Sequence, residues 1–205
     1  MTPRVVGLFS VLSAYLTWGL FPLYFKALES LPVLEVLAHR VVWTLPAAAL
    51  ILTVGSRWRG VRKVLRQPRQ LGLLLATALL IAVNWGVYLW AVTNHRVLDA
   101  SLGYFLTPLM GVVLGIVLFR ERLRPWQWVA VGLAALGILQ VLVREGVFPW
   151  VGLAVATSFG FYGALRKLAL VDSAAGLFLE AALLTPLALA WLFWMSLAQT
   201  PASLH

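Results

Sequence analysis

Long apolar runs, each followed by a short polar connection, constrain this chain more than any other feature. The runs fall at residues 5–25, 34–54, 71–93, 100–119, 126–143, 149–167 and 174–195. A helix needs about 20 mostly apolar residues to cross the hydrocarbon core of a bilayer, whereas membrane barrels use shorter alternating segments. The pattern therefore predicts an all-α polytopic membrane protein with one span for each run.

The overall composition excludes a water-soluble fold. Apolar residues make up 62% of the 205 positions and charged residues 11%, and the mean hydropathy is +0.93. A soluble domain of this size cannot bury so much apolar surface. The first run is too long for the apolar core of a signal peptide and no small-residue cleavage site follows it, so we expect it to stay as the first span.

Basic residues gather in alternate connections between the runs. Twelve of the 16 Lys and Arg residues fall on one predicted side, namely Arg4, the six from Arg57 through Arg69, Arg120, Arg122, Arg124, Arg166 and Lys167. Lys26, Arg96 and Arg144 fall on the other side, and Arg40 lies inside the second run. Because cytoplasmic loops carry an excess of Lys and Arg, the N-terminus and the 57–69 loop are expected in the cytoplasm. The net charge of +9 is therefore a topology signal, and no nucleic-acid partner is expected.

A weak internal repeat links the first two runs to the last two. Residues 13–19 resemble residues 157–163 in their small and aromatic positions at an offset of 144, and Pro46 matches Pro186 at an offset of 140. This spacing predicts a repeat unit of five helices. Because five crossings reverse the direction of the next helix, the second copy is inverted in the membrane.

The repeat also predicts how the chain divides into domains. Residues 1–145 are expected to form a complete first repeat, and residues 146–205 the first two helices of an inverted second repeat. A complete second copy would contain three more helices, so we expect the second repeat to be truncated.

Motifs spread along nearly the whole chain match one family of permeases. They are Trp18-Gly19-Leu20-Phe21-Pro22, Glu35 with His39-Arg40-Val41-Val42-Trp43, Asn84-Trp85 with Tyr88, Ala100-Ser101-Leu102-Gly103-Tyr104-Phe105 with Pro108-Leu109, Arg120-Glu121-Arg122-Leu123, Gln127-Trp128, Pro149-Trp150, and Ser158-Phe159-Gly160 with Arg166-Lys167. On these residues the chain resembles the RarD-type permeases (chloramphenicol-sensitivity proteins) of the EamA group in the drug/metabolite transporter superfamily. The resemblance implies a ten-helix inverted repeat in the bacterial inner membrane and transport of a small organic solute, either a metabolite or a drug.

Ionisable side chains inside a span cost about 2.5 to 3.5 kcal/mol at the helix centre on insertion scales, so each one requires an explanation. Glu35 begins the second run, and His39 follows one turn later on the same face. Such a pair could change protonation near neutral pH and couple solute movement to protons. Alternatively, Glu35 stabilises the start of its helix through the helix dipole while His39 donates to a neighbouring helix.

Arg40 and Glu180 occupy equivalent positions in the two repeats, because their offset is 140. Each is expected about 9 Å from a helix end, at a rise of roughly 1.5 Å per residue, and the two ends face opposite sides of the membrane. This placement indicates a role in gating or in recognition of solute charge. Snorkelling of Arg40 to the surface is the alternative.

Polar side chains also form helical faces in the third and fourth runs. Asn84 and Tyr88 are spaced i and i+4, and Ser101 and Tyr104 are spaced i and i+3. Because a polar face turned toward lipid is costly, these faces are expected to converge on one solute site. The predicted site is lined by His39, Arg40, Asn84, Tyr88, Ser101, Tyr104 and, from the second repeat, Tyr162. The alternative is that Asn84 and Ser101 only join helices to each other.

The sequence carries little support for an enzyme. It has no Cys, only three His residues, no His-Glu-x-x-His motif and no Gly-x-Ser-x-Gly motif. We therefore expect no enzymatic activity, no cofactor and no metal site. The expected partners are a small organic solute, the lipid bilayer, and protons as a coupling ion, whereas the oligomeric state carries no signal. A non-transporting membrane helix bundle, acting as a scaffold or assembly subunit, is the alternative function.

Overall fold

The protein was analysed as a computed structural model, which describes residues 3–145 and 148–198. Within these ranges every regular element is an α-helix. The helices are α1 (Pro3–Lys26), α2 (Val33–Val54), α3 (Trp58–Leu65), α4 (Pro68–Thr93), α5 (Val97–Phe119), α6 (Pro125–Glu145), α7 (Trp150–Leu168) and α8 (Ser173–Ala198). All the predicted apolar runs are helical, which confirms the all-α fold class.

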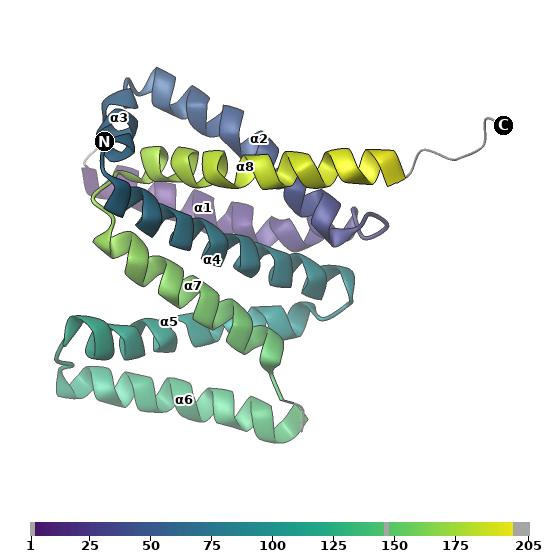
Figure 1. Cartoon of the computed structure of the whole chain (residues 1–205). Helices are drawn as coiled ribbons and strands as arrows, with labels where there is room; N and C mark the ends of the chain where they lie inside the picture. The colour runs from purple at the N-terminus through teal and green to yellow at the C-terminus, as the bar shows by residue number, and fades with distance from the viewer. Residues whose placement is uncertain (1–2, 146–147, 199–205) are drawn as a thin grey trace.

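The seven long helices alternate in direction (Figure 1). The start of α1, the short helix α3, and the connections after α5 and α7 lie at one end of the molecule. We call this the basic end, because it carries most of the Lys and Arg residues, and we call the other the opposite end. Helices α1 and α7 run in opposite directions, as do α2 and α8. An inverted second repeat requires this arrangement.

Five described helices are long and apolar enough to cross a membrane: α1 from Gly7 to Lys26, α2, α4, α5 and α8. In α6 the apolar stretch is shorter, Pro125–Val141. Helix α7 has 19 residues and carries Arg166 and Lys167 in its last turn. The chain is therefore a multi-pass membrane protein, and these five helices have the length that bilayer crossing requires.

Helix α3 corrects one expectation, because the 57–69 segment is more than a loop. Its Val61 and Val64 are only 3% and 2% exposed and pack in an apolar cluster with side chains of α2, α4 and α8. Six basic residues dominate the composition of this segment and hide its short apolar face. The segment is therefore an amphipathic helix laid across the ends of its neighbours (Figure 1).

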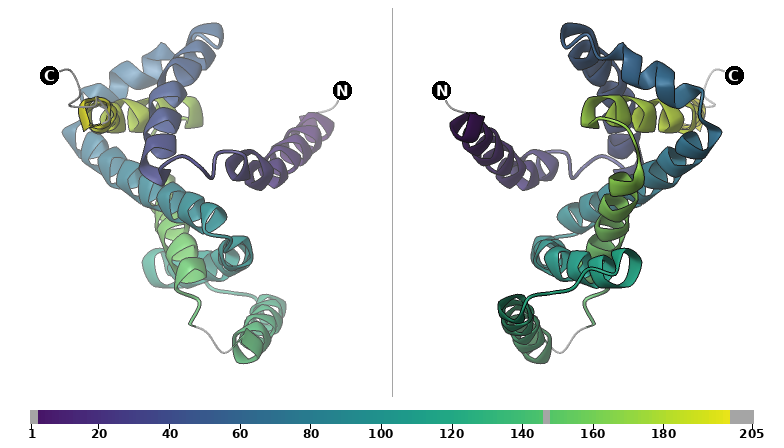
Figure 2. Two further views of the ribbon diagram at one scale, coloured as in Figure 1. Left: turned by 90° about the vertical axis from the view of Figure 1, so that its right-hand side faces the viewer. Right: turned by 90° about the vertical axis from the view of Figure 1, so that its left-hand side faces the viewer.

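Glycines allow α5 and α7 to pack closely. A Cβ atom on Gly103 would lie 2.8 Å from the Cβ of Val155 and 2.9 Å from the carbonyl oxygen of Gly152. Small residues of this kind let helix backbones approach each other in a membrane. By contrast, α1 stands apart at one edge of the bundle and α6 lies at another (Figure 2), and none of the described α6 side chains is buried.

Helix α4 is the centre of the described fold. It contacts α1, α2, α3, α5, α7 and α8. Its buried side chains include the polar residues Thr77 and Asn84 as well as Tyr88. Since every polar group of the candidate site lies on α4 or on a helix that contacts it, this helix determines how the site is assembled.

Candidate functional site

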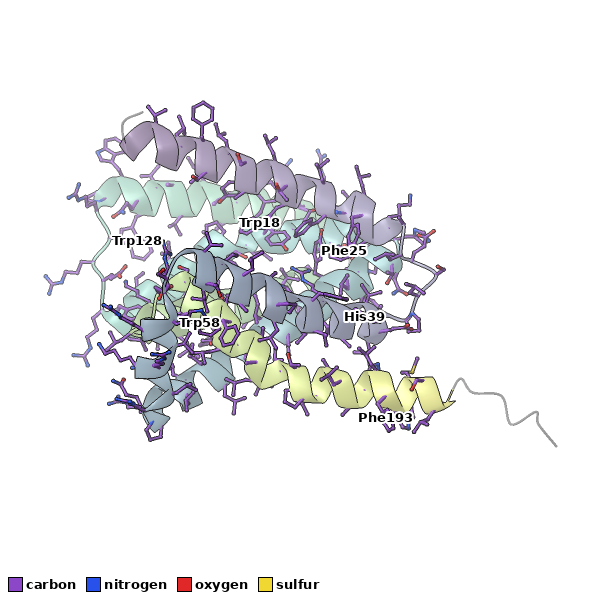
Figure 3. All side chains as sticks on the ribbon, turned by 90° about the horizontal axis from the view of Figure 1, so that it is seen from above. Trp18, Phe25, His39, Trp58, Trp128 and Phe193 are labelled. Carbon is purple, nitrogen blue, oxygen red and sulfur yellow. The ribbon has the colours of Figure 1, made fainter. Side chains whose placement is uncertain are left out.

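A cavity of about 580 Å³ opens between the end of α1 and the first half of α2, near the opposite end of the molecule. It is lined by Phe21, Tyr24, Phe25, Leu28, Leu31, Glu35, Val36, His39, Arg40, Trp43, Thr44 and Ala47. Figure 3 shows that Phe25 and His39 lie on these two helices, toward the end away from Trp58. A volume of this size falls in the range of small-molecule sites.

Arg40 is held in this cavity by aromatic rings. Its guanidinium carbon lies 3.9 Å from the ring centre of Trp85 on α4. The rings of Phe25 and Phe21, both on α1, lie 5.5 and 5.7 Å from the same atom. Such cation–π contacts contribute about 0.5 to 2 kcal/mol and use the face of the guanidinium, so they leave its N–H donors free in the plane.

No carboxylate lies within ion-pair distance of Arg40 among the residues that the structure describes. No hydrogen bond from its guanidinium occurs among them either. A half-buried cation without a counter-ion is unusual inside a membrane helix, where charged groups almost always pair. The Arg40 N–H groups are therefore available to a ligand in the cavity.

Tyr88 and Tyr104 extend this aromatic group away from the cavity wall. The ring centres of Phe25 and Tyr88 are 6.2 Å apart, and those of Tyr88 and Tyr104 are 5.9 Å apart, both edge to face. Tyr88 is 8% exposed and Tyr104 is 46% exposed. The structure thus brings three predicted site residues together from α2, α4 and α5.

Glu35 and His39 both line the cavity, as their shared helical face requires. Glu35 is half-buried and His39 is exposed. No ion pair joins them within the described part of the chain. The two side chains therefore face the same space as Arg40 as separate titratable groups.

Asn84 lies elsewhere, against α7. Its amide nitrogen donates to the carbonyl oxygen of Val155 at 2.9 Å and to the Oγ of Ser158 at 3.1 Å. The residue is only 2% exposed. This is the helix-joining role that the sequence left open as the alternative. Ser101, half-buried on α5, is not among the residues that line the cavity.

A second polar cluster surrounds Glu180, nearer the basic end. The carboxylate is 3% exposed and accepts a hydrogen bond of 2.7 Å from Thr77 on α4. The hydroxyl of Tyr162 on α7 donates to its other oxygen at 3.3 Å. The Nε of Arg166, also on α7, lies 3.7 Å from Oε1. Tyr162 therefore lies with Glu180, and not beside Arg40 as the single predicted site required.

Arg166 is seated against α8 in this cluster. A Cβ atom on Gly176 would clash with its guanidinium, so the glycine leaves the space that the side chain fills. The Nη1 atom of Arg166 is buried and has no hydrogen-bond partner among the described residues. The cluster thus holds a buried carboxylate and a half-buried guanidinium, and the Nη1 atom of that guanidinium has no described partner.

The predicted site residues consequently form two groups. Arg40 contacts α4 at Trp85, whereas Glu180 contacts it at Thr77. These α4 positions are separated by about 12 Å along the helix, at roughly 1.5 Å per residue. Asn84, near the first group along the chain, faces α7 instead.

Sequence reasoning missed several members of both groups. It placed Trp85 and Arg166 in family motifs without a role there, and it otherwise counted Arg166 as a topology signal. Thr77 has no feature in the sequence that marks it, because Thr is common in membrane helices and bonds to its own helix. Only the packing of α8 against α4 brings it to Glu180.

A smaller cavity of about 280 Å³ lies between α5 and α7 near the basic end. Lys167 donates to Glu121 at 2.7 Å at its edge, and its ammonium lies 4.3 Å from the ring centre of Phe119. Both partners of this ion pair are more than half exposed, so the pair contributes little to stability. Within the described ranges no three His, Cys, Asp or Glu side chains are grouped as a metal site would need.

Comparison with known proteins gives consistent matches. A model of the EamA-like transporter family matches residues 5–143. An uncharacterized transporter of Vibrio cholerae is 49% identical over 197 residues, which are 96% of this chain and 65% of that protein. Protein RarD of Salmonella typhimurium is 41% identical over 197 residues, 96% of this chain and 66% of that protein.

Protein RarD of Escherichia coli is 38% identical over 205 residues, 97% of this chain and 69% of that protein. The chain therefore spans about two thirds of the length of the curated relatives it matches, and slightly less for the Vibrio cholerae protein. No solved structure matches it.

Proposed function

Because the chain belongs to the EamA-like transporter family as a RarD-type member, we propose that it forms part of a secondary permease for a small organic solute. The permease acts in the plasma membrane of a bacterium, with the basic end in the cytoplasm. Residues 1–145 form its first repeat and residues 146–205 begin an inverted second repeat. The extent of the family match, residues 5–143, supports this division.

The observation that carries the proposal is Arg40 in its cavity. A guanidinium that has no carboxylate partner among the described residues, and whose face is covered by Trp85, directs its N–H groups at whatever occupies the cavity. Buried polar groups need partners, and a solute with an anionic group would supply one. The aromatic walls favour a solute that also carries an apolar part.

Glu35 and His39 are proposed to couple this site to protons. Both line the cavity beside Arg40, and a carboxyl and an imidazole are side chains that can carry a proton. A proton on either group would alter the charge that an anionic solute encounters. Proton movement and solute movement would then be linked without a metal or cofactor.

Glu180 is proposed to close the path on the cytoplasmic side. Its cluster joins α4, α7 and α8 through Thr77, Tyr162 and Arg166. A solute that passes from the Arg40 cavity to the cytoplasm must separate these helices and break the cluster. Asn84, Ser101 and Tyr162 are proposed to line the path once α4 and α7 have moved apart.

Solute flux into proteoliposomes tests this proposal. The complete gene product is reconstituted, and uptake of labelled small carboxylates, such as benzoate and phenylacetate, is measured beside their uncharged alcohols. Arg40→Gln should reduce carboxylate flux roughly 10- to 100-fold, the value of a charge-assisted hydrogen bond. Arg144→Gln removes a charge at the opposite end outside the cavity and should leave flux unchanged.

Two results would contradict the proposal in different ways. Equal flux in the Arg40→Gln protein and the unchanged protein would mean that the cavity is not the solute site. No flux of any tested solute, with correctly folded protein in the vesicles, would favour the alternative of a non-transporting bundle that acts as a scaffold or assembly subunit.

A further inference from the structure

The segment around α3 carries a concentrated positive charge. Its basic residues are Arg57, Arg59, Arg62, Lys63, Arg66 and Arg69, and every one of them is exposed. No acidic residue occurs in the chain between Glu35 and Asp99. Figure 3 shows nitrogen-bearing side chains gathered at this end, near Trp58. The charge is therefore not neutralised from within the segment.

The described acidic residues nearest this end are already engaged elsewhere. Glu121 accepts from Lys167 at 2.7 Å. Asp172 accepts from two backbone N–H groups in the first turn of α8, each at 3.1 Å, and so caps that helix. Glu180 is buried in its own cluster. The exposed cations of the α3 segment thus form no ion pair within the described residues.

Helix α3 holds these cations in a fixed position. The ring of Trp58 packs edge to face on Phe178 of α8, with centres 5.1 Å apart. A Cβ atom on Gly60 would lie 2.9 Å from Oδ2 of Asp172, so α3 approaches the start of α8 closely. Val61 and Val64 fill the apolar cluster beneath it. The helix therefore lies across the ends of the spans (Figure 1), and its basic side chains are exposed.

We propose that the outward face of α3 binds the headgroups of anionic phospholipids in the leaflet at the basic end. Spans that end in the interface place α3 at the level of the headgroups, where phosphates are the abundant anions. A basic segment next to a span gains about 1 kcal/mol for each Lys or Arg near an anionic surface. Because α3 is already packed, binding does not have to order it first.

The test measures lipid binding directly and does not depend on transport. The purified protein in neutral detergent is titrated with phosphatidylglycerol, and with phosphatidylcholine for comparison, and bound lipid is counted by native mass spectrometry. The triple variant Arg59→Gln/Arg62→Gln/Lys63→Gln should bind phosphatidylglycerol about 100-fold more weakly. Its thermal unfolding without lipid should match that of the unchanged protein, because the three side chains are exposed.

The matched control is Arg120→Gln/Arg122→Gln/Arg124→Gln, which removes the same charge from another connection at the same end. This variant should retain most phosphatidylglycerol binding. Equal losses in the two variants would mean that binding follows total charge, and would overturn the proposal. Equal binding of the two lipids would also overturn it, as would tighter binding of a short DNA duplex than of phosphatidylglycerol in the same detergent.

Discussion

Thr77 on α4 donates a hydrogen bond of 2.7 Å to Glu180 on α8, although 103 positions separate the two residues in the chain. Both side chains are buried, at 0% and 3% exposed. A buried polar contact of this kind helps to fix how the two helices are rotated against each other, because another rotation would break the hydrogen bond from Thr77. The last described helix is therefore linked directly to the centre of the bundle.

Glu180→Leu should lower the free energy of unfolding by about 3 kcal/mol, because it leaves Arg166, whose side chain is 15% exposed, without a carboxylate. The double variant Glu180→Leu/Arg166→Leu removes both charges and should recover part of that loss. Chemical unfolding in a mild detergent measures both of these variants and the single variant Arg166→Leu. A double variant whose loss equals the sum of the two single losses would show that the two charges are not coupled.

Glu121→Leu provides a comparison for this prediction. It removes the carboxylate of an ion pair whose side chains are 51% and 59% exposed. Exposed pairs contribute less than about 1 kcal/mol, so this variant should unfold close to the unchanged protein. A loss as large as that of Glu180→Leu would mean that burial is not what makes the Glu180 cluster important.

Gly103→Ala should destabilise the packing of α5 on α7 by about 1 to 3 kcal/mol, the usual range for an overpacked core. The added methyl group would meet both the side chain of Val155 and the backbone of Gly152, and backbone cannot move aside easily. Gly132→Ala is the matched control, because a Cβ atom at Gly132 meets nothing within 4 Å. Unfolding temperatures in detergent should fall for the first variant only.

The spans could be predicted from the sequence because the length of an apolar run is a local property. The partners of the polar residues could not. Asn84 forms a polar face with Tyr88 in the sequence, yet its amide bonds to α7 while Tyr88 meets Phe25 and Tyr104. Which neighbour a helical face meets depends on how α4 packs with several other helices, and a periodic pattern does not contain that information.

The contact partners of Arg40 and Glu180 could not be predicted from the sequence either. The offset of 140 predicted that Arg40 and Glu180 occupy equivalent positions in two repeats. In the structure, each contacts α4 and the long helix that precedes its own. Their partners differ in kind, however, since Arg40 has aromatic rings and Glu180 has Thr77 and Arg166. A sequence offset predicts a position along the chain, whereas the chemistry at that position depends on side chains that other helices bring to it.

A single cysteine at Arg59 tests which side of the membrane the basic end faces. The chain has no native Cys, so no background label is expected from it. If the positive-inside rule applies, an impermeant maleimide should fail to label Arg59→Cys in intact cells and should label it after the membrane is opened. A cysteine at Glu29, in the connection after α1, should be labelled in intact cells. Labelling of Arg59→Cys in intact cells would place the basic end outside.

The variants Tyr104→Ala and Asn84→Leu should distinguish a role in solute binding from a role in helix packing. Tyr104 is 46% exposed and contacts Tyr88, so its loss should reduce flux while the unfolding temperature changes little. The neighbouring Phe105, 74% exposed, gives the control Phe105→Ala, which should affect neither.

Asn84→Leu removes both hydrogen bonds to α7 and leaves the Val155 carbonyl and the Ser158 hydroxyl without that donor. Its unfolding free energy should fall by about 1 to 3 kcal/mol, because a buried polar contact is lost. Flux and unfolding temperature are measured on the same preparations. If Tyr104→Ala transports normally, that phenol has no part in solute binding. If Asn84→Leu keeps full stability but loses flux, Asn84 acts on the solute, and its bonds to α7 contribute little to holding the helices together.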